Sequence, residues 1–276
     1  MESKPPPASL ARDHPWTDGA LAELYDLFPF ERDIPFYLEL ASSAGPRVLE
    51  LACGSGRLLV PLARAGHTVM GLDSSRPMLA RAQARLERAG QEIAARVGLV
   101  NGDMRSFELD ERFDLAIVAV RSFAYIRSRP DQQAVLGASA RQLRPGGLLA
   151  LDLLNPTPAW LAEPPGSRRQ DLAREVSEEK LIVTRTETVV LTDLAAQVRV
   201  IRSEYELIDE DGAVRKRIVE WPFRYTYRFE AEHLLERAGF EVEAVYGGYE
   251  REDFTSTSET LLVVGRKASD RRETAS

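Results

Sequence analysis

The sequence is poor in residues that form covalent or metal cross-links. Its 276 residues include a single cysteine, Cys53, so an intrachain disulfide is excluded. The three histidines, His14, His67 and His233, lie far apart, and no Cys/His cluster has the spacing of a metal site. We therefore expect no metal cofactor, and we interpret the histidines as packing or surface residues.

Long apolar runs and a basic charge balance are also missing. No stretch reaches the roughly 18 apolar residues of a membrane span, so no membrane association is expected. The N-terminal residues MESKPPPASLARDHPW have no long apolar segment after a basic start, which predicts a cytoplasmic protein without a secretory signal. The formal net charge of −7 disfavours nucleic acid as a partner, because nucleic-acid binders display basic surfaces.

The composition that remains is that of an ordinary globular protein. Hydrophobic residues make up 44% of the chain and charged residues 29%, which is sufficient for a buried core. The length suits one large α/β domain, or one domain with an insertion. Pro5, Pro6 and Pro7 near the start and the polar residues ASDRRETAS at the end predict tails at 1–18 and 268–276 outside the core.

Between about residues 47 and 154, short apolar segments alternate with amphipathic ones. The expected strands are RVLELA, HTVMGLD, a strand within ARVGLVNGD, FDLAIVAV and LLALDLL, and the expected helices are GRLLVPLARAG, SRPMLARAQARLERAG and PDQQAVLGASARQLRPGG. Ser75 is a suitable cap for the second helix, with Pro77 in its first turn and Gly90 after its end. This alternation indicates a parallel sheet covered on both faces by helices.

The pattern changes between about residues 174 and 228. The β-rich segments are KLIVTRTETVVL, QVRVIRSEYELI and AVRKRIVEWPFRYTY, with turns at Thr192-Asp193 and Asp211-Gly212. We interpret 174–228 as an antiparallel β insertion on the substrate side. The core, with an N-terminal cap, would then occupy 19–173 and resume at 229–267.

A strand ends and a helix begins at the segment ELACGSGR, which starts at Glu50. Gly54 and Gly56 allow backbone conformations that other residues avoid, and they let a ligand approach the main chain. In open α/β sheets, ligands bind at the carboxyl ends of the strands. A dinucleotide site would prefer a third glycine where Leu59 stands, and Glu50 would be an unfavourable charge beside a pyrophosphate.

Two acidic residues follow later strands. Asp73 ends the second strand, where a carboxylate can accept hydrogen bonds from both hydroxyls of a ribose. A turn or helix-capping aspartate is the competing interpretation. After the third strand, Asp103 can accept from an adenine amino group and Met104 can pack on the ring, although Gly-Asp is common in loops.

Taken together, the segments LELACGSGRL, GLDSSRPML, NGDMRSF, FDLAIVAVRSFAYI and LRPGGLLALDLLNP resemble the class I S-adenosylmethionine-dependent methyltransferases. The resemblance covers about residues 20–155, and AGFEVEAVYGGY also fits. It implies a Rossmann-like sheet of seven strands, mostly parallel with the last antiparallel, with helices on both faces. It also implies S-adenosyl-L-methionine as cofactor and S-adenosyl-L-homocysteine as product. Ala52 departs from the family, which often has glycine there, but its methyl group is small.

The resemblance also assigns roles to individual residues. The cofactor-binding residues that it implies are Tyr25, Glu50, Ala52, Gly54, Gly56, Asp73, Ser74, Asp103, Met104 and Ala119. Asp73 would bind the ribose with Ser74 beside it, and Asp103 and Met104 would hold adenine. Tyr25 would lie near the sulfonium or the carboxylate, although helix packing explains it equally well.

Methyl transfer from a sulfonium is an in-line displacement on an electrophile that is already activated. The protein mainly aligns the reactants and excludes water, and a base is needed only if the nucleophile arrives protonated. No catalytic residue stands out. Arg121, Tyr125 and Tyr225 are candidates for the substrate pocket, although a cross-strand ladder also explains the aromatic residues of the insertion.

We therefore predict a methyltransferase that acts on N or O of a small molecule, because the position of the insertion resembles that of small-molecule methyltransferases. The alternatives are a macromolecular (RNA or protein) methyltransferase, a non-catalytic protein that retains the cofactor fold, and a nicotinamide-dependent oxidoreductase. The sequence does not identify the acceptor, and it does not distinguish a monomer from a homodimer.

Overall fold

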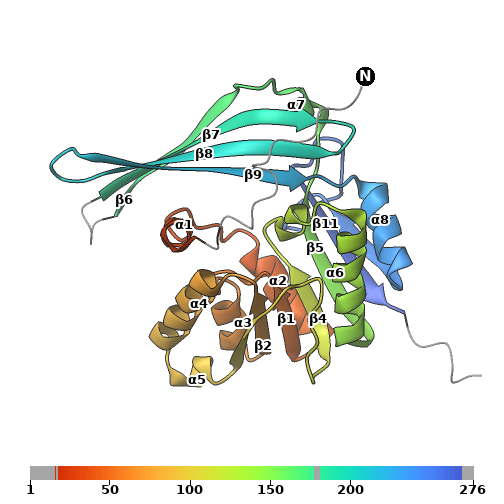
Figure 1. Cartoon of the computed structure of the whole chain (residues 1–276). Helices are drawn as coiled ribbons and strands as arrows, with labels where there is room; N and C mark the ends of the chain where they lie inside the picture. Colours follow the sequence, from red (N-terminus) through yellow and green to blue (C-terminus); the bar gives the residue numbers. More distant parts are fainter. Residues whose placement is uncertain (1–15, 17, 177–180, 269–276) are drawn as a thin grey trace, which may run out of the picture. The chain divides into compact units, whose positions relative to one another are not determined.

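The computed structural model describes residues 16, 18–176 and 181–268, which form two compact units. Unit 1 comprises Met1–Pro29 and Pro158–Arg224, and unit 2 comprises Phe30–Thr157 and Tyr225–Ser276 (Figure 1). The tails predicted at 1–18 and 268–276 lie almost entirely outside the described residues. None of the helices in the described ranges is long and apolar enough to cross a bilayer.

Unit 2 contains a sheet of seven strands in the order β10-β11-β5-β4-β1-β2-β3. The strands are β1 Arg47–Leu51, β2 Thr68–Asp73, β3 Val97–Asn101, β4 Phe113–Val118, β5 Leu143–Leu154, β10 Phe240–Tyr246 and β11 Thr260–Lys267. Strands β1 to β5 pair in parallel, whereas β11 is antiparallel to β5 and β10. The predicted Rossmann-like sheet with an antiparallel last strand is confirmed.

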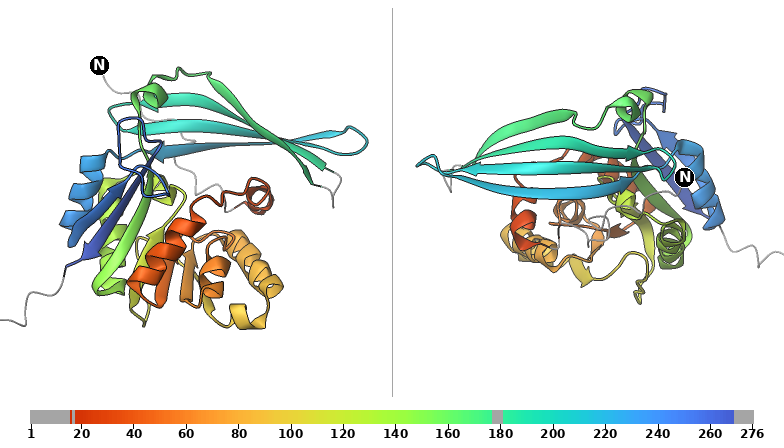
Figure 2. Two further views of the ribbon diagram at one scale, coloured as in Figure 1. Left: turned by 180° about the vertical axis from the view of Figure 1, so that it is seen from behind. Right: turned by 45° about the horizontal axis from the view of Figure 1, so that its top comes forward.

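Helices cover both faces of this sheet (Figure 2). They are α2 Ile34–Ala44, α3 Leu59–Arg64, α4 Arg76–Ala89, α5 Gln91–Ala94, the 3-10 helix η3 Ser122–Tyr125, α6 Arg129–Gln142 and α8 Arg228–Arg237. Side chains of α2 and α3 pack on one face, and those of α6 and α8 pack on the other. The predicted cap of α4 is confirmed, because the Ser75 hydroxyl accepts the N–H of Met78.

One helix is shorter than predicted. Helix α6 was expected to continue to Gly147, but it ends at Gln142, and β5 begins at Leu143. Residues 143–147 carry Pro145 and two glycines, which do not sustain a helix. Strand β4, at the centre of the sheet, is buried along its whole length, which explains its continuous apolar sequence.

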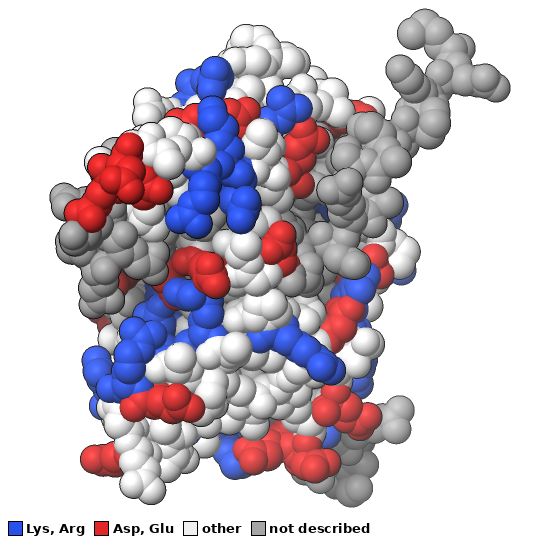
Figure 3. Space-filling model, turned by 60° about the vertical axis from the view of Figure 1, so that its left-hand side comes forward, with Lys and Arg blue, Asp and Glu red and all other residues white. Residues whose placement is uncertain are grey.

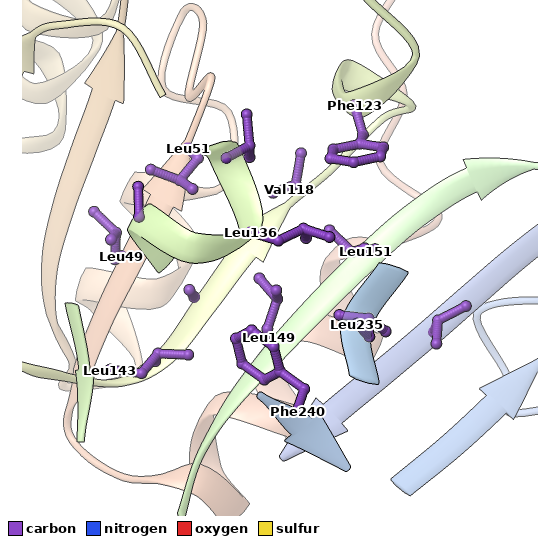
Figure 4. Close-up of a cluster of buried hydrophobic side chains, with 14 of the residues drawn as sticks. Leu49, Leu51, Val118, Phe123, Leu136, Leu143, Leu149, Leu151, Leu235 and Phe240 are labelled. Atoms are coloured by element: carbon purple, nitrogen blue, oxygen red, sulfur yellow. The ribbon is translucent and has the colours of Figure 1, made fainter. Parts of the chain in front are cut away.

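Alternate residues of the central strands point to opposite faces of the sheet. Leu49 and Leu51 of β1 belong to the cluster in Figure 4, whereas Val48 packs with α2 and α3. Because side chains alternate along a strand, Glu50 points to the α2 side. Asp152 of β5 also lies between two leucines of the Figure 4 cluster, so it points to the same side. Two acidic side chains thus enter the interior from one face.

Unit 1 is built on an antiparallel sheet of four strands in the order β6-β7-β8-β9. Its elements are α1 Gly19–Tyr25, α7 Pro158–Ala162, β6 Arg168–Val176, β7 Leu181–Asp193, β8 Val198–Ile208 and β9 Val214–Arg224. The sheet therefore starts at Arg168, before the predicted start of the insertion at residue 174. Residues 19–29, predicted to be the N-terminal cap of the core, cluster with this sheet in unit 1.

One face of the four-stranded sheet is covered by residues from the start of the chain. The buried cluster consists of Leu21, Leu24, Leu181, Val183 and Tyr205. The ring of Trp221 lies 5.0 Å from that of Trp16, and its Nε1–H donates to Ser203 Oγ at 3.1 Å. Tyr205 and Trp221 are therefore core residues of unit 1.

The opposite face of this sheet carries cross-strand ion pairs. Arg202 pairs with Glu220 at 2.6 Å, and Lys216 pairs with Glu206 at 2.5 Å. Figure 3 shows Lys and Arg side chains interleaved with Asp and Glu over one face of the molecule. Exposed pairs of this kind contribute at most about 1 kcal/mol each, so the stability of unit 1 depends mainly on its buried cluster.

Candidate active site

The loop between β1 and α3 contains three residues in the left-handed region. The φ angle is +56° at Ala52, +55° at Gly54 and +76° at Gly56. A Cβ atom at Gly54 would lie 3.1 Å from Met78 Cε, and one at Gly56 would lie 3.1 Å from Ala82 Cβ. Both glycines are therefore needed for conformation and for close packing on α4.

Asp73, the last residue of β2, is hydrogen-bonded to this glycine turn. Its Oδ2 accepts the N–H of Gly54 at 2.8 Å, and its Oδ1 accepts the N–H of Ser75 at 2.7 Å. Burial raises the pKa of Asp73, and these two backbone hydrogen bonds lower it. Two backbone donors thus fix the carboxylate plane, while each oxygen retains a further lone pair for a ligand. The structure brings together the two motifs that the sequence placed apart.

Glu50 lies in β1, directly before the turn, and its carboxyl group is buried. Its Oε2 has no hydrogen-bond partner among the described residues. Burial raises the pKa of Glu50 to about 8, with an opposing effect from Arg57. A buried carboxyl oxygen without a partner is costly, so a ligand that donates a hydrogen bond to Oε2 would be stabilised here. The ammonium group of an amino-acid moiety is such a donor.

Arg57 is held in place by a buried ion pair that the sequence analysis did not predict. Its Nη1 and Nη2 donate to Asp33 Oδ1 and Oδ2 at 2.5 and 2.6 Å. The Asp33 side chain is fully buried, and the guanidinium lies 5.9 Å from the Phe30 ring centroid. The two residues are 24 positions apart, and no local pattern connects them. This pair joins the segment before α2 to the glycine turn.

On the predicted adenine side, Asp103 is engaged by a neighbouring side chain. Arg105 Nε donates to both carboxylate oxygens at 3.0 and 2.9 Å, and Nη2 donates to Oδ2 at 2.5 Å. The hydrogen bonds of Arg105 lower the pKa of Asp103, so this carboxylate is ionised and can accept further hydrogen bonds.

Asn101 connects the ends of β2 and β3, a role that the sequence analysis did not assign. Its Nδ2 donates to the carbonyl oxygens of Asp73 and Ser74 at 3.0 and 3.1 Å. The side chain of Ser74 is exposed, and Met104 is partly buried against the cluster in Figure 4. The backbone carbonyl groups of Asp73 and Ser74, two predicted cofactor-binding residues, are therefore held by a side chain from β3.

The loop after β4 contains a second left-handed turn, directly after the buried Ala119. The φ angles of Val120 and Arg121 are +48° and +59°, and such values are unusual for a β-branched residue. The Oδ2 atom of Asp152 accepts the N–H of Val120 at 2.9 Å and the hydroxyl of Tyr249 at 2.8 Å. Neither Asp152 nor Tyr249 was predicted, although an aspartate within LLALDLL was an available signal.

The predicted pocket residues Tyr125 and Tyr225 belong to unit 2, whereas Tyr25, predicted to bind the cofactor, belongs to unit 1. Tyr125 lies in η3, after the β4 loop, and is partly buried. Tyr225 is buried in unit 2, with its ring edge-to-face at 5.7 Å from that of Tyr227. Tyr25 belongs to α1 of unit 1, where its ring lies 4.9 Å from that of Trp16. The assignment of Tyr25 to the cofactor stays a prediction.

The described histidines and the Cys53 thiol offer neither a metal site nor an activated nucleophile. Within the described ranges, no group of three or more His, Cys, Asp or Glu residues could hold a metal ion. His67 is buried, and the exposed His233 lies 3.1 Å from Glu236, while His14 is outside the described residues. Burial raises the pKa of the Cys53 thiol, so it is not an activated nucleophile.

The fold and this site define a class of protein. A seven-stranded sheet with one antiparallel strand carries a left-handed glycine turn after β1 and an aspartate, bonded to that turn, at the end of β2. This is the Rossmann-like arrangement of the class I S-adenosylmethionine-dependent methyltransferases. The unpartnered Glu50 oxygen suits the ammonium group of the methionine part, so the site fits this cofactor.

Comparisons with known proteins agree. Residues 48–147 match the family model described as a methyltransferase domain. A cypemycin N-terminal methyltransferase of a Streptomyces species is 29% identical over 220 residues, which cover 80% of this chain and 82% of that protein. A ubiquinone biosynthesis O-methyltransferase of Pseudomonas fluorescens is 29% identical over 147 residues, which cover 52% of this chain and only 60% of that protein.

A solved structure shows the same fold. The CcbJ methyltransferase of Streptomyces caelestis matches with a TM-score of 0.77 at 22% identity, covering 94% of this chain and 100% of that one. The matched methyltransferase domain and the fold support an S-adenosylmethionine-dependent methyltransferase of class I.

Replacing Ala52 by glycine should stabilise the protein. The left-handed conformation costs a residue with a Cβ about 1–2 kcal/mol, and the greater freedom of glycine in the unfolded chain offsets about 0.4–1 kcal/mol. We expect the free energy of unfolding in urea to rise by about 1 kcal/mol. The control Ala84→Gly, at an exposed position in α4, should lower it by about 1 kcal/mol. If Ala52→Gly also lowered it, backbone strain at Ala52 would be refuted.

Replacing Glu50 by glutamine should change the pH dependence of stability. The folded state holds the Glu50 proton up to about pH 8, whereas the unfolded chain releases it near pH 4.5. Wild-type stability therefore falls as the pH rises through this range, by up to about 1.4 kcal/mol per pH unit. In urea denaturation from pH 5 to 9, the free energy of unfolding of Glu50→Gln should rise relative to that of the wild type up to about pH 8. Glu92→Gln, on exposed α5, is the control; parallel curves for wild type and Glu50→Gln would disprove the assignment.

Proposed function

We propose that this enzyme transfers the methyl group of S-adenosylmethionine to a nitrogen or oxygen atom of a small molecule by in-line displacement. The observation that carries the proposal is the hydrogen bond from Gly54 to the Asp73 carboxylate. This bond holds the Asp73 carboxylate, the proposed ribose ligand, beside the glycine turn at the carboxyl edge of a parallel sheet. Ligands of open α/β folds bind at this edge.

In this proposal, the β1–β2 half of the site holds the ribose and methionine parts of the cofactor. Asp73, with Ser74 beside it, accepts hydrogen bonds from the ribose hydroxyls. The methionine ammonium satisfies Glu50 Oε2, and the backbone of Ala52, Gly54 and Gly56 lies against the methionine part. The cost of burying Glu50 without a partner is then relieved by binding.

The adenine and acceptor sides use the loops after β3 and β4. Asp103 accepts a hydrogen bond from the adenine amino group, while Arg105 holds the Asp103 carboxylate in place. Met104 packs on the adenine ring. Ala119 lies near the methionine part. The adenine side thus depends on an exposed ion pair, which salt weakens.

When bound, the sulfonium supplies an activated methyl group, so the protein acts through alignment and exclusion of water. Positioning alone contributes about 7–11 kcal/mol in well-oriented reactions. Arg121, Tyr125 and Tyr225 are the proposed lining of the acceptor pocket, and Arg121 can bind an acceptor carboxylate. A neutral amine acceptor requires no general base, whereas a hydroxyl acceptor must lose its proton, and we assign no residue to that role.

The names of the relatives support a small acceptor without fixing the atom. One relative is named for N-terminal methylation and the other for O-methylation in ubiquinone biosynthesis. A peptide α-amine is the second candidate, because the first relative is named for an N-terminal acceptor. The net charge of −7 disfavours RNA.

The proposal can be tested by supplying the full chain and methyl-labelled S-adenosylmethionine with separate metabolite and peptide fractions. Mass spectrometry should find one added methylene mass on a small molecule. Label on peptides alone would favour the second candidate. Tight binding of S-adenosylhomocysteine without label on any fraction would favour a non-catalytic protein.

Asp73→Ala should weaken S-adenosylhomocysteine binding by about 1.5–3 kcal/mol, which is roughly 10- to 150-fold in Kd. The reason is the loss of charge-assisted hydrogen bonds to the ribose, and isothermal titration calorimetry measures it. Asp73→Asn keeps one acceptor oxygen, so its Kd should lie between those of the wild type and Asp73→Ala. Asp110→Asn, at an exposed position, should bind like the wild type. An unchanged Kd in Asp73→Ala would remove the ribose assignment.

Gly54→Val should abolish S-adenosylhomocysteine binding. A branched side chain at φ +55° is strained, and its Cβ would lie 3.1 Å from Met78 Cε. It would also stand on the main chain that the ligand is proposed to approach. Gly66→Ala is the matched control, because Gly66 has φ +97° with open space around its Cβ position. The control should lose stability and keep its affinity. Normal binding by Gly54→Val would refute the role of the turn.

A further inference from the structure

Two strand ends of unit 2 are built in the same way. At the end of β2, Asp73 Oδ2 accepts the N–H of Gly54 from the loop after the neighbouring strand β1. Near the end of β5, Asp152 Oδ2 accepts the N–H of Val120 from the loop after the neighbouring strand β4. The distances are 2.8 and 2.9 Å. Both loops contain left-handed residues, so each carboxylate holds a turn of high conformational energy.

The Asp152 side chain is fully buried, and only one of its oxygens is used. Oδ1 has no hydrogen-bond partner in the part of the chain that the structure describes. Oδ2 accepts from both Val120 and Tyr249. Tyr249 belongs to the segment that connects β10 and β11. Its ring centroid lies 5.6 Å from that of Phe30 and 6.4 Å from that of Phe36. One carboxylate oxygen therefore joins the β4 loop to the β10–β11 segment.

Ionisable groups surround Asp152 from three elements. Burial raises the pKa of Asp152 to about 6, while the Tyr249 hydrogen bond and the charge of Arg121 oppose this rise. Asp33, directly before α2, raises the pKa further. Tyr37 of α2 has a buried hydroxyl without a partner among the described residues, and burial and the charge of Asp152 raise its pKa. An aspartate at this position is unfavourable for stability, which points to another reason for its presence.

We propose that Asp152 is a positioning residue of the acceptor half of the site: it holds the loop after β4 as Asp73, itself a proposed ligand of the ribose, holds the glycine turn. The inference rests on the proposed function. The loops at the carboxyl ends of β4 and β5 face the acceptor only if the loops at the carboxyl ends of β1 and β2 hold the cofactor. Asp152 is buried and does not touch the acceptor. It acts by holding Val120 and Arg121 in a turn that valine disfavours, and so it fixes where Arg121 stands.

Asp114 provides a matched control within the same unit. It is the second residue of β4, at the opposite edge of the sheet, and it is also buried. Its carboxylate accepts the N–H of Arg47 at 2.9 Å and Arg144 Nη1 at 2.8 Å. Asp114→Asn therefore removes the charge of a buried carboxylate that also accepts two hydrogen bonds, but at the end of β4 away from the proposed acceptor.

The first test compares Asp152→Asn with Asp114→Asn by hydrogen exchange and S-adenosylhomocysteine titration on the full chain. In Asp152→Asn, amide exchange at 119–125 and 247–258 should accelerate about tenfold or more. Exchange at 50–57 and the Kd should stay within about twofold, because the proposed contacts of Glu50, Gly54 and Asp73 lie on β1, β2 and the loop between them, and Ala119 precedes the turn that Asp152 holds. In Asp114→Asn, the segments 119–125 and 247–258 should exchange as in the wild type. Unchanged exchange in Asp152→Asn, or the same pattern in both variants, overturns the inference.

The second test uses Tyr249→Phe, which deletes one oxygen and keeps the aromatic packing. The ¹⁵N shift of the Val120 amide should titrate near pH 6 in the wild type, because its partner is Asp152. The midpoint should move up in Tyr249→Phe, since the lost hydrogen bond lowered the pKa. A midpoint that does not move overturns the inference, and this holds even if Asp152→Asn fails to fold.

Turnover separates the inference from the function on which it rests. With the acceptor found by labelling, Asp152→Asn should raise the acceptor KM about tenfold and leave the KM for S-adenosylmethionine within about twofold. Equal changes in both KM values would make Asp152 a purely structural residue. A wild-type protein that binds no S-adenosylhomocysteine overturns the proposed function, whereas binding with an unaltered 119–125 segment in Asp152→Asn overturns only this inference.

Discussion

The hydrogen bond between the Gly54 amide and the Asp73 carboxylate is the contact on which the site depends. Carboxyl ends of neighbouring parallel strands lie at one edge, so a side chain as short as aspartate reaches the loop of the next strand. The bond holds a turn with three left-handed residues and fixes the carboxylate beside that turn. Sheet order, glycine spacing and acidic residue are therefore parts of one geometric requirement.

The buried carboxyl groups inside unit 2 follow from the same geometry. Glu50, Asp73 and Asp152 have raised pKa values because burial disfavours their ionised forms, and Asp33 is buried with Arg57 as its ion-pair partner. An interior that holds several carboxyl groups and few cations favours a ligand that carries positive charge. S-adenosylmethionine carries two such groups, a sulfonium and an ammonium.

Features set by local pattern were predictable from the sequence, and features set by distant residues were not. The buried strand β4, the Ser75 cap and the glycine turn each have a local signal in composition or spacing. Strand β6 reads RRQDLAREV, too polar for a strand pattern, and it gains its structure from pairing with β7. The contact between Asp152 and Tyr249 joins residues 97 positions apart, which no spacing rule connects.

The order of segments along the chain has a consequence for biosynthesis. Unit 1 combines the first 29 residues with 158–224, and unit 2 needs β10 and β11, which follow residue 224. During translation, β1 to β5 emerge first, and the segment that carries α1 must wait for the four-stranded sheet. Neither unit can therefore finish folding until nearly the whole polypeptide has left the ribosome, and no single cut separates one from the other.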